Sequence, residues 1–230
     1  MIDKKKYPLF LSANIKSWGV DVYHGTELDK DPRMLAVRKE ILERDKFTCQ
    51  YCGFASGKYQ EIHHLDGDHN NFNKNNLVTV CPLCHQVHHI DSVSLTRGGY
   101  IGIVPELSQE SINLLFFFLF ICKEVGDEKY ASVSKSLINQ FEQRINLMNV
   151  IMPDSQEPVI FAEALLRSPK EFYTQRTKKL KEFKLIPSHF KFEDKHIKYW
   201  ASKYADPKEF QKWEENFNFV CKKLNITQAD

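Results

Sequence analysis

Two Cys-x-x-Cys pairs constrain the fold of this chain more than any other feature of its sequence. Cys49 and Cys52 form the first pair, in TCQYCG, and Cys81 and Cys84 form the second, in VCPLCH, with twenty-eight residues between the pairs. Two such pairs supply four sulfur ligands to one ion, and a tetrahedral Zn²⁺ bound by four thiolates keeps no open coordination position. We therefore predict a structural zinc ion that stabilises this part of the chain.

The composition is that of an ordinary globular protein, with 42% hydrophobic and 27% charged residues among 230. The formal net charge of +2 is too small to indicate nucleic-acid binding by itself. No apolar segment near the start is long enough for a signal peptide, so we expect a cytoplasmic protein with metal-bound rather than disulfide-bonded cysteines. The most apolar run, INLLFFFLFIC, covers about half of the roughly 20 residues that a membrane-spanning helix needs. We expect a buried helix there and no membrane span.

Turn and capping signals predict short strands and one helix on either side of the metal-ligand segment. The alternation of Trp18, Val20 and Val22 predicts one or two short strands within the first thirty residues. Asp31 is the expected N-cap of a helix in DPRMLAVRKEILERD, with Pro32 at its first position. YQEIHH reads as a short extended run, and RGGYIGIVPEL predicts a glycine-rich turn followed by another short strand.

The second half of the chain has a helical pattern almost to its end. Ser108 is the expected cap of the apolar helix, which should end near Gly126, and Ser168 the expected cap of a helix in SPKEFYTQRTKKLKEF. A helix face is predicted for Tyr130, Val133, Leu137, Ile138, Phe141, Ile145 and Met148. A last helix, from ADPKEF on, carries an apolar stripe of Phe210, Trp213, Phe217, Val220 and Leu224. We predict two regions, residues 1–105 with the metal module and its N-terminal flank, and residues 106–230, which are helical.

Six of the nine histidines lie between residues 62 and 89, around the second cysteine pair. His85 and His89 are four residues apart on an expected helix, so both can reach one ion, and His63 can reach it from the preceding strand. Three imidazoles leave open positions on a metal for water and a phosphate oxygen. The next strand residue, His64, points the other way and is available as a general base. Imidazole accepts several metals, so the second ion is open among Mg²⁺, Mn²⁺, Ni²⁺ and Zn²⁺.

The segments ERDKFTCQYCG, IHHLDGDHNN and NNLVTVCPLCHQVHH, within about residues 43–92, resemble the HNH nuclease motif. This motif is a ββα-metal hairpin and helix, and its variant with two Cys-x-x-Cys pairs carries a structural zinc. The resemblance implies that His64 is the general base and that Asn76 pins the hairpin loop. It also implies the ligands of a catalytic metal, namely His63, His85 and His89. His88 could replace His89, but the family's spacing of four favours His89; the opposing interpretation is that the histidines are relics.

A longer resemblance covers about residues 17–200. RDKFTCQYCGF, LDGDHNN, NLVTVC, VPELSQESIN and EFKLIPSHFKF together resemble the IcmJ (DotN) family of type IVB secretion systems. The resemblance implies a cytoplasmic adapter whose HNH-like zinc fold binds an extended tail of the coupling ATPase, beside other subunits at the inner membrane. The histidines need not persist in such an adapter. This sequence keeps them, which departs from that pattern.

The predicted fold is α+β, with an HNH-like ββα-metal module and its four-cysteine zinc site, flanked by short strands and followed by a mainly helical half. The leading functional hypothesis is a zinc-binding adapter of a type IVB secretion coupling complex. Its partners would be the coupling ATPase tail and other secretion-complex subunits. The alternative is a metal-dependent HNH DNA endonuclease that hydrolyses phosphodiester bonds, with DNA as its partner. Whether the chain is an enzyme depends on whether the histidine site is active.

Overall fold

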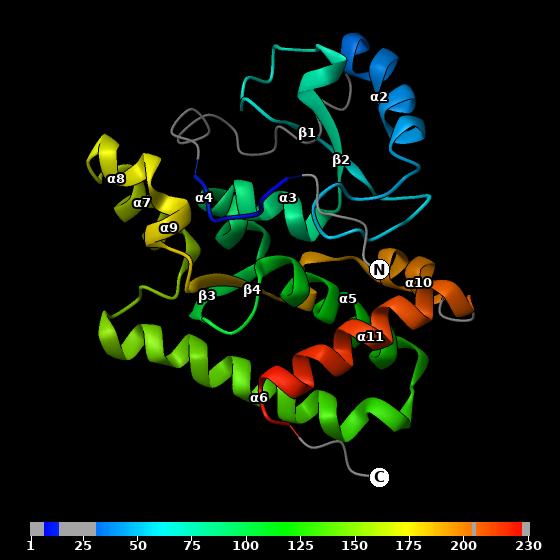
Figure 1. The fold of residues 1–230 in the computed structure, drawn as a ribbon, viewed down its shortest axis with the longest axis vertical. Helices are drawn as coiled ribbons and strands as arrows, with labels where there is room; N and C mark the ends of the chain where they lie inside the picture. The colour runs from blue at the N-terminus through cyan, green and yellow to red at the C-terminus, as the bar shows by residue number, and fades with distance from the viewer. Residues whose placement is uncertain (1–6, 14–30, 204–205, 227–230) are drawn as a thin grey trace.

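The computed structural model describes residues 7–13, 31–203 and 206–226 (Figure 1). Its first elements are α2 (Pro32–Arg44), β1 (Glu61–His64), η2 (Lys74–Asn76), β2 (Leu77–Val80), α3 (Pro82–His88), α4 (Ile90–Val93), η3 (Ser94–Thr96) and β3 (Gly99–Ile103). They are followed by α5 (Gln109–Val125), α6 (Glu128–Ile151), α7 (Pro158–Leu166), α8 (Lys170–Thr174), α9 (Arg176–Lys179), β4 (Phe183–Pro187), η4 (His189–Lys191), α10 (Asp194–Ala201) and α11 (Pro207–Lys223). The predicted α+β class is confirmed. The strands expected at Trp18, Val20 and Val22 lie outside the described residues.

A β-hairpin followed by a short helix forms the part of the fold that carries the cysteines and histidines. Strand β1 pairs antiparallel with β2, with His63 opposite Val78 and His64 opposite Leu77. A single residue, Cys81, separates β2 from helix α3 and is the N-cap of that helix. The order strand, strand, helix therefore agrees with the predicted succession of elements, and α2 lies beside the hairpin (Figure 1).

Helix α2 contacts the hairpin through a small apolar cluster that is separate from the main core. Its N-cap is Asp31, as predicted, because the Asp31 side chain accepts a hydrogen bond from the amide of Arg33. Side chains from the buried face of α2 meet side chains from both strands. The cluster consists of Met34, Ile41, Ile62 and Leu77.

Asp45, the C-cap of α2, links the end of this helix to strand β2 by a hydrogen bond. Its carboxylate accepts hydrogen bonds from the Thr79 amide at 2.8 Å and from Arg44 Nε at 2.8 Å. Burial raises the pKa of Asp45, but these hydrogen bonds outweigh burial and hold it below its ordinary value. We expect Asp45→Asn to lower the free energy of unfolding by about 2 kcal/mol at pH 7, because charge-assisted hydrogen bonds are weakened. Urea denaturation measures this difference.

The same variant should show a characteristic pH dependence. Because the folded-state pKa of Asp45 is depressed, its contribution to stability is fully present above the ordinary carboxyl pKa of about 4. That contribution is lost as the pH falls through the lower folded-state value. The stability difference between wild type and variant should therefore shrink below about pH 4. An equal difference at pH 3 and pH 7 would contradict the assigned ion pair.

A second two-stranded sheet joins segments from either side of the boundary predicted near residue 105. Strand β3 pairs antiparallel with β4, with Gly99 opposite Pro187 and Ile103 opposite Phe183. The helical pattern expected to continue through this region is wrong at β4. Residues 183–187 form a short apolar run that ends in proline, and such a run is ambiguous between strand and helix until its pairing partner is known.

The helix expected in SPKEFYTQRTKKLKEF is also divided, and its predicted cap is wrong. It consists of two short helices, α8 and α9, and the N-cap of α8 is Pro169. The Ser168 hydroxyl donates instead to the carbonyl of Leu165 at 2.6 Å, at the end of α7. Its side chain therefore completes the preceding helix rather than starting the next one.

Helix α5 is the centre of the main core. It starts at the N-cap Ser108 and ends at Gly126, as predicted, and Gly126 has a left-handed φ of 69° that glycine adopts without strain. Most of its side chains are buried, because α5 contacts α10, α11 and β4. Its uniform hydrophobicity therefore reflects burial within the protein. Within the described ranges, no helix is both long enough and apolar enough to cross a bilayer.

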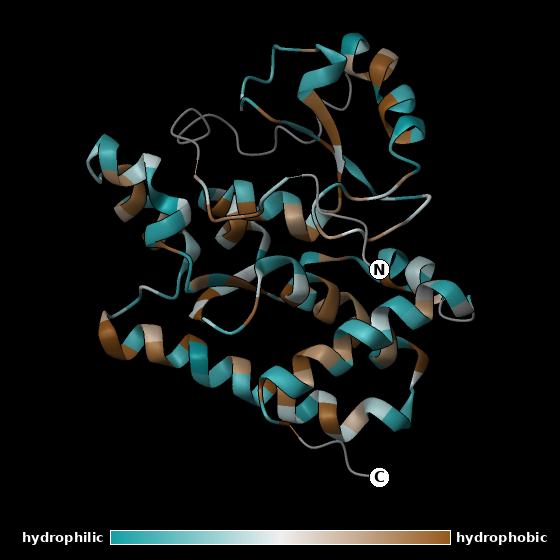
Figure 2. Ribbon diagram, in the orientation of Figure 1, coloured by the Kyte–Doolittle hydropathy of each residue, from teal (hydrophilic) through white to brown (hydrophobic). Residues whose placement is uncertain are grey.

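Helices α6 and α11 cover α5 with amphipathic faces, visible as alternating hydrophilic and hydrophobic residues in Figure 2. The predicted stripe of α11 is confirmed, with Trp213, Phe217, Val220 and Leu224 buried and Phe210 packed against them. The predicted face of α6 is wrong at Ile138, which is 41% exposed. One residue turns a helix by about 100°, so Ile138 lies to the side of the stripe that contains its buried neighbour Leu137.

Candidate metal centres

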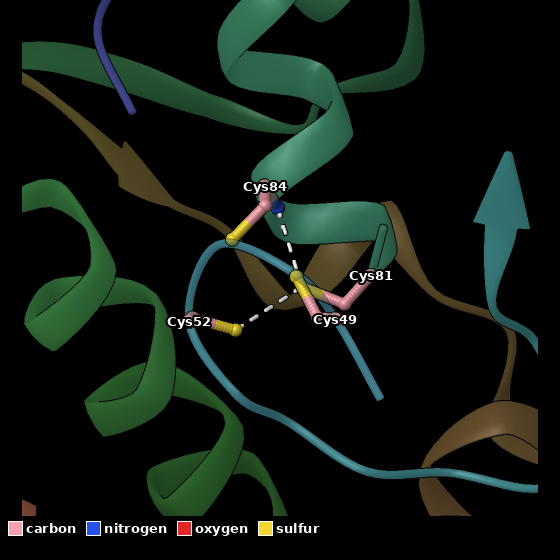
Figure 3. A group of neighbouring side chains, drawn as sticks. All are labelled: Cys49, Cys52, Cys81 and Cys84. Atoms are coloured by element: carbon pink, nitrogen blue, oxygen red, sulfur yellow. Dashed lines mark hydrogen bonds between the residues drawn. The ribbon is translucent and has the colours of Figure 1, made fainter. Parts of the chain in front are cut away.

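Four cysteine side chains from two separate segments meet in one buried place (Figure 3). Cys49 and Cys52 come from the turn before β1, Cys81 caps α3, and Cys84 lies in its first turn. Their sulfur atoms all lie within 4.8 Å of one another, and the Sγ atoms of Cys52 and Cys81 are 3.6 Å apart. The structure thus brings together the four cysteines that the sequence predicts as ligands.

The geometry of this cysteine group fits a tetrahedral metal ion. A Zn–S bond of about 2.3 Å separates neighbouring sulfur atoms by about 3.8 Å in a tetrahedron, close to the 3.6 Å between Cys52 Sγ and Cys81 Sγ. None of the four cysteines forms a disulfide. Burial raises the pKa of the Cys81 and Cys84 thiols well above their ordinary value. A bound divalent cation would offset this effect by stabilising the thiolate form, and the group can hold an ion such as zinc.

The backbone around each pair directs the sulfur atoms inward. After the first pair, the amide of Gly53 donates to the carbonyl of Cys49 at 2.9 Å, and Gly53 has a left-handed φ of 79°. Glycine takes this conformation without the steric cost that a side chain brings. At the second pair, the amide of Cys84 donates to Cys81 Sγ at 3.4 Å, so the start of α3 supports negative charge on that sulfur (Figure 3).

Helix α5 adds a side-chain contact to the cysteine group that sequence reasoning missed. Asn113 Nδ2 donates to Cys84 Sγ at 3.3 Å, and Asn113 is completely buried. The available signal was a single amide inside the apolar run INLLFFFLFIC. An amide at such a position requires a buried partner, although the sequence does not say which one.

Three histidines form a second group next to the hairpin. One ring nitrogen each of His63, His85 and His89 lie within 4.8 Å of one another. The helical spacing expected for His85 and His89 is wrong in detail, because α3 ends at His88 and His89 is its C-cap, with φ −132° and ψ 51°. The bend there still leaves the ring centroids of His85 and His89 5.0 Å apart. Their roles as metal ligands stay a prediction.

Two further residues contact this histidine group. Glu61 Oε2 lies 2.6 Å from His85 Nδ1. A hydrogen bond from Nδ1 to Glu61 would leave Nε2 of the same ring for an ion, the usual relation between a carboxylate and a metal-binding histidine. His88 stacks on His63 with ring centroids 4.1 Å apart, so its own ring lies beside the group. Sequence reasoning did not find Glu61, because a strand residue gives no sign of its cross-element partner.

Burial keeps the imidazoles of His63, His64, His88 and His89 neutral. Burial, followed by the neighbouring histidines, lowers the pKa of His63 and His89 well below the ordinary value. Burial likewise lowers the pKa of His88 to about 3 and that of His64 to about 4. All four rings are therefore uncharged at neutral pH, and the neutral ring is the form that binds a metal or accepts a proton.

His64 faces away from His63, as strand alternation predicts. Its ring lies 5.2 Å from that of His69 and 5.9 Å from that of Phe72, centroid to centroid. His64 is nearly fully buried, and within the described part of the chain its Nε2 has no hydrogen-bond partner. His69 lies in the loop after β1 and is half-buried beside His64.

Asn76 joins the two ends of the loop between β1 and β2. Its Oδ1 accepts from the Asp66 amide at 3.1 Å, and its Nδ2 donates to Asp66 Oδ1 at 2.8 Å and to the Asn71 carbonyl at 3.2 Å. The Asn76 carbonyl also accepts from the amide of Leu65, the residue after His64, at 2.9 Å. These are the contacts that a loop-pinning residue would make, and that role stays a prediction.

Comparison with known proteins gives one informative similarity. No protein-family model matches the chain. The type 4 apparatus protein DotN of Legionella pneumophila is 33% identical to it over 205 residues. The alignment covers 87% of this chain and 92% of DotN. The similarity therefore extends well beyond the cysteine and histidine segments and includes most of the helical half.

Proposed function

The chain belongs to the DotN (IcmJ) family, and from this membership we propose that it is a subunit of a type IV secretion apparatus. The observation that carries the proposal is 33% identity over nearly the full length of both chains. More specifically, we propose an adapter in the coupling complex of a type IVB system. It binds an extended tail of the coupling ATPase and other subunits, which place it at the cytoplasmic side of the inner membrane.

A zinc-stabilised, HNH-like scaffold is the proposed structural basis of this adapter. Two observations support it, namely the hairpin followed by α3 and the grouping of four buried cysteines at the start of that helix. Zn²⁺ would be held by Cys49, Cys52, Cys81 and Cys84 and would cross-link the first cysteine turn to α3. An adapter benefits from such a cross-link, because a preorganised surface avoids the ordering cost of binding.

Co-purification tests the adapter proposal directly. A tagged copy of the chain, isolated from its native host, should carry the coupling ATPase in stoichiometric amount, identified by mass spectrometry. A truncated ATPase that lacks its extended tail should no longer co-purify. A folded, zinc-loaded chain that recovers no ATPase would count against the adapter.

A metal-dependent DNA endonuclease is the second candidate, favoured by the histidine group. A divalent ion bound by His63, His85 and His89 would supply Lewis-acid stabilisation of the scissile phosphate and the leaving oxygen. His64 is neutral, and among the described residues its Nε2 has no hydrogen-bond partner, so it would take a proton from the attacking water. Asn76 would hold His64 in register through its contacts across the loop.

Plasmid cleavage separates the two candidates. Supercoiled plasmid would be incubated with the purified chain and Mg²⁺, Mn²⁺, Ni²⁺ or Zn²⁺ in turn, beside the His64→Ala variant. If the second candidate is right, wild-type cutting should fall about 100-fold or more in His64→Ala, the usual effect of losing a general base. His189→Ala is the matched control, because the His189 ring contacts Phe190 in η4 and is not one of the grouped histidines, and it should cut normally.

Metal content completes the test. His64 has no ligand role in this proposal, so His64→Ala should keep the same number of bound ions as wild type. Loss of one ion would assign His64 to the ligands instead. No cutting with any metal, by protein shown to be folded and zinc-loaded, would remove the second candidate and leave the histidines as relics on an adapter.

A further inference from the structure

We propose that two buried amides, Asn113 and Gln109, form a directed hydrogen-bond chain that makes Asn113 a positioning residue for the metal bound by the cysteine group. The chain runs from strand β4 through helix α5 to Cys84. It rests on the proposal above that the four cysteines bind an ion. It adds a residue of the helical half to a site otherwise built from residues 49–84.

The contacts form an unbroken path. The amide of Leu185 in β4 donates to Gln109 Oε1 at 2.9 Å, and Gln109 Nε2 donates back to the Leu185 carbonyl at 2.6 Å. Gln109 Nε2 also donates to Asn113 Oδ1 at 3.0 Å. Asn113 Nδ2 then donates to Cys84 Sγ at 3.3 Å. Each contact is within hydrogen-bond range, and both side chains lie one turn apart on α5.

A backbone amide fixes the direction of this path. The N–H of Leu185 can only donate, so the oxygen of Gln109 must face it and the amino group of Gln109 must face Asn113. Asn113 therefore presents its oxygen to Gln109 and its amino group to Cys84. Reversing either amide would place two donors or two acceptors against each other. The sulfur of Cys84 is thus required to accept, which a metal-bound thiolate does and a protonated thiol does poorly.

Burial excludes water from these hydrogen-bonding groups, so their partners must come from the protein. Gln109 and Asn113 are 2% and 0% exposed, and Cys84 and Leu185 are both completely buried. Four thiolates around a divalent cation carry a net negative charge, which needs hydrogen-bond donors when water is excluded. Outer contacts of this kind orient ligands and change metal affinity by about 10- to 100-fold when they are removed.

The test compares two buried asparagines in the full chain. Asn113→Leu removes the donor to sulfur, whereas the control Asn216→Leu removes a buried amide of α11 that donates to the Ser111 carbonyl of the same helix α5. Competition with a chromophoric chelator would measure Zn²⁺ affinity. Affinity should fall about 10- to 100-fold in Asn113→Leu and less than about threefold in the control. The sulfur-to-metal absorption of the Co²⁺-loaded protein should shift in Asn113→Leu alone.

A second variant keeps the proposal testable if Asn113→Leu does not fold. Gln109→Met retains Asn113 but removes the amide that orients it, and it should lower Zn²⁺ affinity by at least about threefold. Wild-type affinity in whichever variant folds, or the same loss in the Asn216→Leu control, would overturn the role of Asn113. A wild-type chain that binds no Zn²⁺ would instead refute the metal proposal on which this one rests.

Discussion

Cys81→Ser is expected to abolish folding of the segment that contains both cysteine pairs. Cys81 supplies one of four sulfur atoms within 4.8 Å of one another and is also the N-cap of α3. A structural Zn²⁺ bound by such a group contributes on the order of 10 kcal/mol, comparable with the whole stability of a domain. Circular dichroism melting and zinc content measured on the same sample would show a lost transition and lost metal together.

Cys221→Ser is the matched control for this result. Cys221 is as buried as the ligands but lies in α11, outside the group of four. Its substitution should leave the zinc content at the wild-type value and lower stability only by the cost of a buried polar atom, about 1–3 kcal/mol. A strong chelator added to wild type should reproduce the Cys81→Ser melting behaviour. An unchanged melting curve in Cys81→Ser would remove the structural-metal proposal.

The cysteine group could be predicted from sequence because its chemistry is local. Each Cys-x-x-Cys pair is a turn or helix start that presents two thiols in the same direction, so the spacing alone indicates a site. The helix starts at Asp31 and Ser108 could be predicted for the same reason, because a capping side chain accepts a hydrogen bond from an amide two or three residues away. In each of these features, the residue that determines the local structure lies within a few positions of the backbone it affects.

The missed features depend on partners that are distant in the sequence. Strand β4 becomes a strand because β3 lies beside it, about eighty residues earlier, and nothing within FKLIP distinguishes that outcome from a helical turn. The roles of Glu61 and Asn113 are similar, since each is defined by a contact with another element. The position of His69 beside His64 is likewise non-local, because contacts that Asn76 makes at the far end hold the loop that carries His69.

Phe117→Ala is expected to destabilise both predicted regions together. Phe117 of α5 is completely buried and stacks on Phe54, which follows the first cysteine pair, with ring centroids 4.0 Å apart. It also meets Trp200 of α10 edge-on at 5.0 Å, and Trp200 Nε1 donates to Ser56 Oγ at 3.2 Å. Truncation would remove one ring from an aromatic cluster shared by residues on both sides of position 105. The expected loss is about 3–5 kcal/mol of unfolding free energy.

Two probes in one urea titration would show whether the predicted boundary near residue 105 divides the folding of the chain. Co²⁺ absorption reports on the cysteine group, and in a Trp18→Phe background tryptophan fluorescence reports on α10 and α11 through Trp200 and Trp213. Because Phe117 contacts both sides, the two transitions should coincide in wild type and move together in Phe117→Ala. Phe219→Ala, at a position 44% exposed on α11, is the control and should move neither by more than about 0.5 kcal/mol. Separate transitions, with only the fluorescence midpoint shifted in Phe117→Ala, would instead support two independently folding regions, 1–105 and 106–230.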